Sequence, residues 1–213
     1  MGRAAAFATL LLPVLLLAGC TGPSSTNAKP EASAQAVPTT QASAAPGAQP
    51  PSAAVSCSGQ QTAAETEGPF FKAGSPERTS LVDAGMSGTR ITITGHVLTL
   101  ACRPISGVVL DFWQADASGA YDNAGYRLRG HQVTDAGGRY SLETVVPGDY
   151  PGRTQHIHVK VAAPGKPVLT TQLYFPGSAR NQTDSLFKPA LLLQVSDAAS
   201  GKTAAFDFVL DVR

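Results

Sequence analysis

Two histidines, His156 and His158, stand two residues apart in a stretch rich in β-branched side chains. Ile157, Val159 and Val161 surround them, which is a composition typical of a β-strand. Because alternate side chains of a strand point to the same face, both imidazoles would lie on one face, where they can bind one metal ion. Such pairs also occur as packing or solvent-facing residues, so the pair by itself indicates a metal site only weakly.

Two tyrosines can complete a metal site with these histidines. Tyr150 follows a Pro-Gly-Asp turn and precedes His156 by six residues, and Tyr121 follows an earlier predicted strand. Tyrosine has a pKa near 10, so it binds a metal as phenolate only where a strong Lewis acid displaces its proton. A hard anionic oxygen suits Fe(III) better than Zn(II), which prefers cysteine, histidine and carboxylate ligands. The residue types therefore favour an iron site.

The elements that must position these side chains are predicted to be short strands. The chain has 213 residues, 43% of them apolar, which allows one well-cored domain with appendages. Its 21 glycines and 16 prolines disfavour long helices. Strands are predicted at residues 90–100, 108–113, 128–134, 139–146, 156–161, 168–174, 191–195 and 204–209. This spacing, with turn residues between most strands, predicts an all-β fold, an antiparallel β-sandwich with little helix.

The first 56 residues are predicted to be targeting and tether segments rather than part of the fold. Residues 1–20 contain a positive charge and an apolar run that ends at Leu17-Ala18-Gly19-Cys20, which resembles the bacterial lipobox. Cys20 would then carry lipid and hold an exported protein on the cell membrane or envelope surface. An ordinary secretory signal or a membrane anchor is the alternative. Residues 21–56, mostly Ala, Pro, Ser, Thr and Gln, predict a disordered tether, and residues 57–213 the folded domain.

The two remaining cysteines, Cys57 and Cys102, form an even pair in a chain predicted to leave the cytoplasm. They predict a disulfide that closes a loop of about 45 residues. Two unrelated thiols are the alternative.

Several segments together resemble the intradiol ring-cleavage dioxygenases, a family that includes catechol and protocatechuate dioxygenases. The matching segments are residues 66–69, 110–116 with 119–121, 129–135, and 147–153 followed by His156, Ile157 and His158. The resemblance runs from about Thr66 to Pro189, and its last segment is the most specific. It implies non-haem Fe(III) held by two tyrosines and two histidines. By position, Tyr150 and His156 match the axial ligands, and Tyr121 and His158 the equatorial ligands.

The resemblance also implies a reaction and its catalytic residues. Members of the family insert both atoms of O₂ into an aromatic diol and cleave the bond between its two hydroxylated carbons, which yields a muconate-type diacid. Tyr150 would serve as ligand and then as base. Arg153 aligns with the arginine that stabilises charge on the substrate, and Gln172 with a glutamine at the edge of the same pocket. The implied partners are the diol and O₂, with no organic cofactor, and a homo-oligomer is left open.

Other candidate residues have simpler explanations. His96 is expected to be a solvent-side or capped histidine, and His131 either a hydrogen-bond donor behind the site or an ordinary strand residue. The remaining aromatic residues considered, expected to pack in the sandwich or at its rim, are Trp113, Tyr126, Tyr140 and Tyr174.

A competing function is a non-catalytic β-sandwich binding module on a tether, because fold alone does not separate the two cases. The two-tyrosine, two-histidine set favours the enzyme, since a binding module has no need of it. The formal net charge of +1 gives no electrostatic argument for nucleic-acid binding. An exported dioxygenase is expected to meet catechols outside the cell, such as those released from plant polymers.

Overall fold

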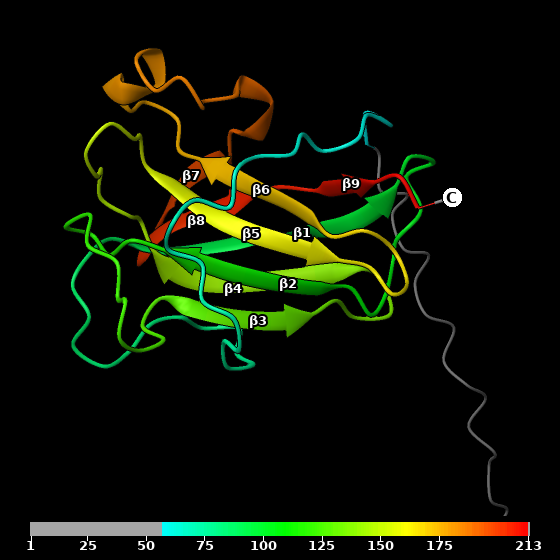
Figure 1. Cartoon of the computed structure of the whole chain (residues 1–213), viewed down its shortest axis with the longest axis horizontal. Helices are drawn as coiled ribbons and strands as arrows, with labels where there is room; N and C mark the ends of the chain where they lie inside the picture. The colour runs from blue at the N-terminus through cyan, green and yellow to red at the C-terminus, as the bar shows by residue number, and fades with distance from the viewer. Residues whose placement is uncertain (1–56, 213) are drawn as a thin grey trace, which may run out of the picture. The chain divides into compact units, whose positions relative to one another are not determined.

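The computed structural model describes residues 57–212 (Figure 1). Segments in which apolar and polar residues alternate form its β-strands. The predicted signal segment, the tether and Cys20 lie outside the described residues. The strands are β1 (Arg90–Thr99), β2 (Val109–Gln114), β3 (Arg129–Val133), β4 (Arg139–Val145), β5 (His156–Ala162), β6 (Leu169–Tyr174), β7 (Gln194–Ala198), β8 (Gly201–Ala205) and β9 (Phe208–Leu210). Two short 3₁₀ helices, η1 (Ala179–Gln182) and η2 (Pro189–Leu191), are the only helical segments of the described chain, which confirms the all-β expectation.

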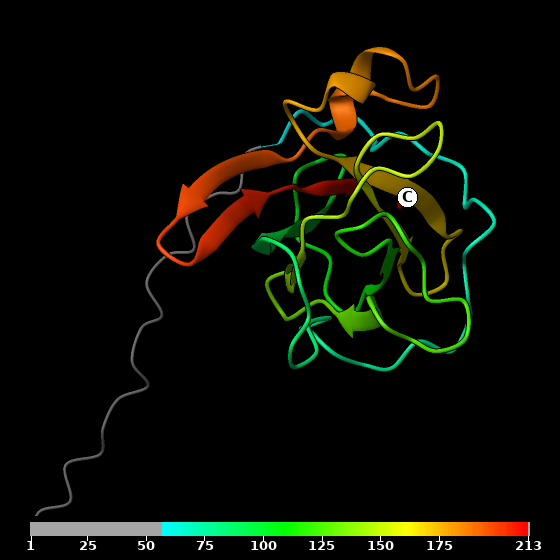
Figure 2. The ribbon, with the colours of Figure 1, turned by 90° about the vertical axis from the view of Figure 1, so that its left-hand side faces the viewer.

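The strands form two sheets. One contains β4, β1, β8 and β7 in that order, with β9 also paired to β1, and the other has the order β3-β2-β5-β6. The four-stranded sheet is antiparallel throughout, whereas β1 pairs in parallel with both β8 and β9. The turned view in Figure 2 shows the hairpin of β7 and β8 extending away from the rest of the sandwich. The predicted sandwich is therefore mainly, but not wholly, antiparallel.

The predicted strand at residues 204–209 is divided in two. β8 pairs with the first half of β1 and β9 with the second half, and Phe206 and Asp207 between them belong to neither strand. A side chain at Gly95 would place its Cβ 1.8 Å from the carbonyl oxygen of Phe206, so this close approach requires glycine. The predicted strand at residues 191–195 was also misplaced. Pro189 begins a 3₁₀ helix there, and β7 starts only at Gln194.

The inner faces of the two sheets bury one apolar core. Leu110, Phe112 and Val159 contribute to it from the four-stranded sheet, and Ile93 and Leu142 from the other sheet, each with 0% exposure. Because successive side chains alternate between faces, the neighbours of these residues on the four-stranded sheet point to its outer face. That outer face carries the candidate site.

An extended segment, residues 60–78, crosses the outer face of the four-stranded sheet and is called the strap below. It is the cyan segment in front of the sheet in Figure 1. Backbone hydrogen bonds anchor it at Thr62 to Val209, at Glu65 to Thr170 and at Arg78 to His131. Its anchors therefore run from β9 across β6 to β3.

No helix among the described residues is long and apolar enough to span a membrane.

A disulfide joins Cys57 to Cys102, with an S–S distance of 2.01 Å and a Cα–Cα distance of 5.6 Å. The predicted pairing is thereby confirmed. It fixes the chain just before the strap to the turn that follows β1.

We expect the double substitution Cys57→Ser, Cys102→Ser to lower the free energy of unfolding by roughly 4 kcal/mol, because the bond closes a loop with a sequence separation of 45. Urea unfolding of the oxidised wild type and the variant measures this difference. Equal denaturation midpoints and slopes would show that the bond contributes no stability.

Candidate metal centre

A row of four side chains crosses the outer face of the four-stranded sheet. Arg129 on β3 is opposite Trp113 on β2, which is opposite His158 on β5, which is opposite Gln172 on β6. Directly opposed residues of an antiparallel sheet project to the same face. His156 projects beside this row, two residues before His158 on the same strand. The strand register therefore brings both predicted histidine ligands and Gln172 to one place.

The two histidines point their Nε2 atoms at each other, 3.1 Å apart. His156 Nδ1 lies 2.6 Å from the carbonyl oxygen of Thr154, which can only accept a hydrogen bond. Nδ1 therefore carries the proton, and Nε2 presents a lone pair toward His158, as a metal ligand does. Burial lowers the pKa of His156 to about 4. Burial and the neighbouring His156 lower the pKa of His158 well below its usual value, so both rings are neutral at pH 7.

The turn before Tyr121 packs directly on the turn before Tyr150. Gly119 has φ +86°, and a Cβ there would lie 2.1 Å from the carbonyl oxygen of Asp149, so only glycine allows this contact. The two phenol rings lie with centroids 5.8 Å apart and planes at 85°. Phe70 from the strap stacks on Tyr121 at 4.3 Å. Two turns far apart in the sequence thus deliver the two phenols to one site.

The phenols adjoin the histidines. The ring centroids of Tyr150 and His156 are 5.7 Å apart, and those of Tyr121 and His158 are 6.4 Å apart. Burial, followed by the charge of Tyr150, raises the pKa of Tyr121 above its usual value. Tyr121 therefore keeps its proton at neutral pH unless a strong Lewis acid displaces it.

This donor set fits a ferric ion better than a zinc ion. The Nε2 atoms of His156 and His158 are 3.1 Å apart. This separation allows both nitrogens to bind one ion, each at a distance of about 2 Å. No group of three or more His, Cys, Asp or Glu residues within residues 57–212 could hold a metal. The phenols of Tyr121 and Tyr150 adjoin the two histidines and could serve as further ligands of such an ion, as phenolates.

Arg153 is held in place beside the phenol of Tyr150. Its Nε donates to Asp184 Oδ2 at 2.9 Å, and its Nη2 donates to Gln172 Oε1 at 2.5 Å. Burial alone would lower the pKa of Arg153, but Asp184 and then Tyr150 outweigh burial and raise it. Gln172 in turn donates from Nε2 to the carbonyl oxygen of Thr66 in the strap, at 2.9 Å. Arg153 is thus a permanent cation with a fixed orientation at this site.

The sequence did not predict the positions of three residues that contact the site. Trp113 is buried as expected, with 1% exposure, but it lies outside the core cluster and stacks on His158, with centroids 4.8 Å apart and planes at 6°. It lies opposite His158 on the neighbouring strand, a pairing that the sequence alone does not state. Tyr174, expected to be a core or rim aromatic, is fully buried and donates to Gln172 Oε1 at 2.9 Å. Asp184 had no sequence signal at all.

Two histidines do not contribute to the site. His96 pairs through Nδ1 with Asp207, at 3.2 Å. His131 Nδ1 lies 2.8 Å from the carbonyl oxygen of Ser75. His96 is thus a capped surface histidine as expected, and His131 serves to fasten the strap.

The strap roofs the histidines. Gly68 has φ +68°, and a Cβ there would lie 3.3 Å from Cε1 of His158, so the strap backbone rests against the imidazole. The ring of Phe71 meets that of Trp113 at 4.9 Å. The carbonyl oxygen of Phe70 accepts a hydrogen bond from Arg129 Nη1 at 2.6 Å. The roof limits the access of water to the histidines from this side.

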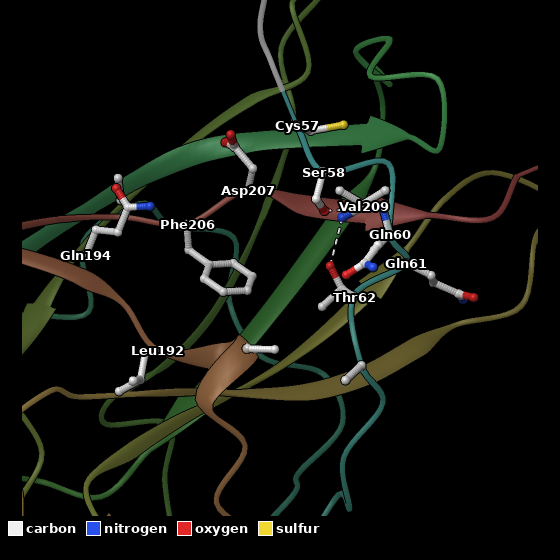
Figure 3. Close-up of a pocket in the computed structure, with 13 residues that line it drawn as sticks. Cys57, Ser58, Gln60, Gln61, Thr62, Leu192, Gln194, Phe206, Asp207 and Val209 are labelled. Atoms are coloured by element: carbon white, nitrogen blue, oxygen red, sulfur yellow. Dashed lines mark hydrogen bonds between the residues drawn. The ribbon is translucent and has the colours of Figure 1, made fainter.

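Two of the cavities in the described chain differ in their relation to the site. One of about 420 Å³ adjoins it at Phe70 and is lined by Pro69, Phe70, Phe71, Lys72, Asn123 and Arg129. Another, of about 350 Å³, lies where the strap begins (Figure 3). Its lining includes Cys57, Thr62, Leu192, Gln194, Phe206 and Asp207 but none of the residues predicted to bind metal or act in catalysis. The first cavity also contains none of those residues, and it adjoins the site only through Phe70, which stacks on Tyr121, and Arg129, which lies opposite Trp113.

Acid is expected to destabilise the metal-free protein. A histidine whose pKa is lower in the folded than in the unfolded chain binds more protons on unfolding, so the free energy of unfolding falls as the pH drops from 6.5 toward about 4. For His156 the full shift corresponds to about 3 kcal/mol, and His158 acts in the same direction.

Urea unfolding of the metal-free protein at pH 7 and at pH 4.5 measures this loss. The variant His156→Gln, His158→Gln should lose less stability over the same interval. An equal loss in both proteins would show that other groups cause it.

Comparisons with known proteins agree with this geometry. A family model described as "Dioxygenase" matches residues 66–212. The chain is 58% identical to the dioxygenase domain of a dioxygenase carbohydrate-binding protein fusion from Streptomyces sp. SirexAA-E, with a TM-score of 0.71 over 72% of this chain and 100% of that one. It is 29% identical to chlorocatechol 1,2-dioxygenase of Rhodococcus opacus, over 71% of this chain and 73% of that enzyme.

A third relative is covered less fully. The chain is 33% identical to the protocatechuate 3,4-dioxygenase beta chain of Burkholderia cepacia over 120 residues, which are 47% of this chain and 51% of that one. The family match covers most of the domain that carries the two tyrosines and two histidines. The chain belongs to the intradiol ring-cleavage dioxygenases.

Proposed function

We propose that this protein uses Fe(III), bound by Tyr121, Tyr150, His156 and His158, to cleave a catechol-type diol with O₂ to a muconate-type diacid. The observation that carries the proposal is the 3.1 Å approach of the two histidine Nε2 atoms, with two phenols beside them. When bound there, Fe(III) would act as a Lewis acid and template for the diol oxygens.

The residues around the donors have separate tasks in this proposal. Tyr150 lies at a turn, where its backbone forms an isolated bridge with Arg153, and its Oη would accept a proton from the diol as the substrate binds. Arg153, fixed by Asp184 and Gln172, would stabilise negative charge that develops on the substrate. Burial of the site strengthens this electrostatic effect, because few water molecules screen it.

The comparisons support a small aromatic diol as the substrate. The relatives are described as enzymes for chlorocatechol and protocatechuate, and the Streptomyces relative as a fusion with a carbohydrate-binding protein from a cellulolytic bacterium. We infer that this chain acts on catechols released outside the cell, including those from plant material.

Oxygen uptake by the iron-loaded domain tests the proposal. Catechol, protocatechuate, hydroxyquinol and chlorocatechol are offered in turn, and the products are identified by mass. We expect a red-brown protein whose absorption shifts when a diol is added, and uptake of one O₂ per diol cleaved. A colourless protein that consumes no O₂ with any of the four diols would favour the non-catalytic binding module instead.

We further propose that residues 1–20 direct export, that lipid on Cys20 anchors the protein to the membrane or envelope, and that residues 21–56 tether the domain at 57–213. The Cys57–Cys102 disulfide supports an oxidising location. Labelling with a radioactive fatty acid tests the anchor: the wild type should incorporate label and Cys20→Ser should not. Sedimentation of the purified domain then determines whether it forms a homo-oligomer.

A further inference from the structure

One buried carboxylate outside the predicted site residues, that of Asp184, contacts the site from the loop after η1. Its side chain is 2% exposed. Oδ2 accepts hydrogen bonds from Arg153 Nε and from the backbone N–H of Thr154, both at 2.9 Å. Oδ1 accepts one from the backbone N–H of Leu186, also at 2.9 Å. Three donors therefore converge on this carboxylate.

These contacts reach two parts of the site. The side chain of Arg153 is 12% exposed, and Asp184 provides its one ion pair within residues 57–212. The peptide at Thr154 leads to His156, because the Thr154 carbonyl oxygen accepts the Nδ1–H of that imidazole. Asp184 thus fixes both the direction of Arg153 and the backbone at the start of β5.

We propose that Asp184 is a positioning residue that orients Arg153 toward the bound diol, an inference that rests on the proposed function. The planar guanidinium has five N–H donors. Asp184 holds Nε and Gln172 holds Nη2, so the plane is defined at two corners and the remaining donors are directed by geometry. With one corner released, the cation can rotate away from the charge it must stabilise.

Asparagine is the sharpest replacement, because it keeps the size of the side chain. An amide has one acceptor oxygen and one NH₂ donor. If the amide oxygen faces Arg153, the NH₂ group faces the N–H of Leu186, and two donors meet. If the amide is turned over, the NH₂ group instead faces the donors of Arg153 and Thr154. Asp184→Asn therefore cannot satisfy all three donors, and it removes the charge in either orientation.

Loosening of the loop in general must be separated from loss of the Arg153 contact. Asn181 supplies the matched control. It accepts from Thr154 Oγ1 at 2.6 Å and donates to the Phe175 carbonyl oxygen at 2.9 Å, and neither bond involves Arg153. Asn181→Ala releases the same segment while leaving the Arg153–Asp184 pair intact.

The first measurement uses metal-free, ¹⁵N-labelled protein and needs no turnover. Hydrogen exchange at Arg153 Nε should be slow in the wild type and in Asn181→Ala. In Asp184→Asn it should be at least about 10-fold faster, since a hydrogen bond between charged groups is lost. Unchanged exchange in Asp184→Asn would overturn the proposal whether or not the protein is an enzyme.

The second measurement is a double-mutant cycle on kcat/KM for diol cleavage. Asp184→Asn alone should reduce kcat/KM about 100-fold, mostly through kcat, while iron content stays at the wild-type level. Added to Arg153→Met, it should cause no further loss. Equal losses with and without Arg153 would overturn the proposal, because Asp184 would then act by another route. Absence of turnover in the wild type would refute the proposed function and leave the exchange measurement to decide on Asp184.

Discussion

His158→Ala is expected to yield protein without stoichiometric iron. His158 is 1% exposed, between the Trp113 indole and the strap, and its Nε2 is one of only two imidazole nitrogens in the donor cluster. Alanine removes that nitrogen, and the roof formed by Gly68 limits the approach of a replacement ligand. We expect iron affinity to fall by well over the 10- to 100-fold that loss of a mere supporting contact costs. Iron per chain after dialysis, and the red-brown absorption, measure the outcome.

The control for this substitution must test folding as well as chemistry. Deleting a buried ring leaves a cavity and costs several kcal/mol, so circular dichroism must show that His158→Ala is folded under the conditions of the iron assay. His96→Ala removes a histidine that pairs with Asp207 outside the site, and it should keep its iron. One iron per chain in folded His158→Ala would remove His158 from the ligand set.

The sequence predicts those parts of the site whose geometry depends on residues close together in the chain. His156 and His158 share a strand, so the two-residue period alone predicted that they face the same way, and their Nε2 atoms meet at 3.1 Å. Tyr121 and Tyr150 followed from their positions and donor chemistry, and Gln172 from the resemblance alone; the structure brings all three to the same place.

What escaped prediction depends on contacts between distant segments. Trp113 is on the site face because of the pairing of β2 with β5, a register that no local pattern states. Asp184 reaches Arg153 across a loop without strand periodicity. Likewise, the split into β8 and β9 follows from the approach of Phe206 to Gly95, which composition cannot reveal. Periodicity finds the faces of strands, whereas the partners of each face are set by tertiary structure.

Tyr150→Phe is expected to abolish most turnover while the fold and iron binding persist. A phenyl ring can occupy the same place as the phenol ring, whose centroid lies 6.0 Å from that of Phe70 and 5.7 Å from that of His156, so packing is preserved. The substitution removes only the oxygen, which in the proposed function both binds metal and accepts a proton. General acid–base groups typically contribute 10²- to 10⁴-fold, so we expect kcat to fall by at least about 10²-fold.

The readouts separate the two tasks of this oxygen. Loss of one phenolate ligand should change the absorption of the iron-loaded protein before substrate is added, whereas loss of the base should appear as slow O₂ uptake with diol bound. Tyr126→Phe is the matched control, because its hydroxyl donates to the Ala73 carbonyl oxygen at 2.8 Å and not to the donor cluster; it should keep wild-type colour and rate. Full activity in Tyr150→Phe would mean that the proton passes to another group.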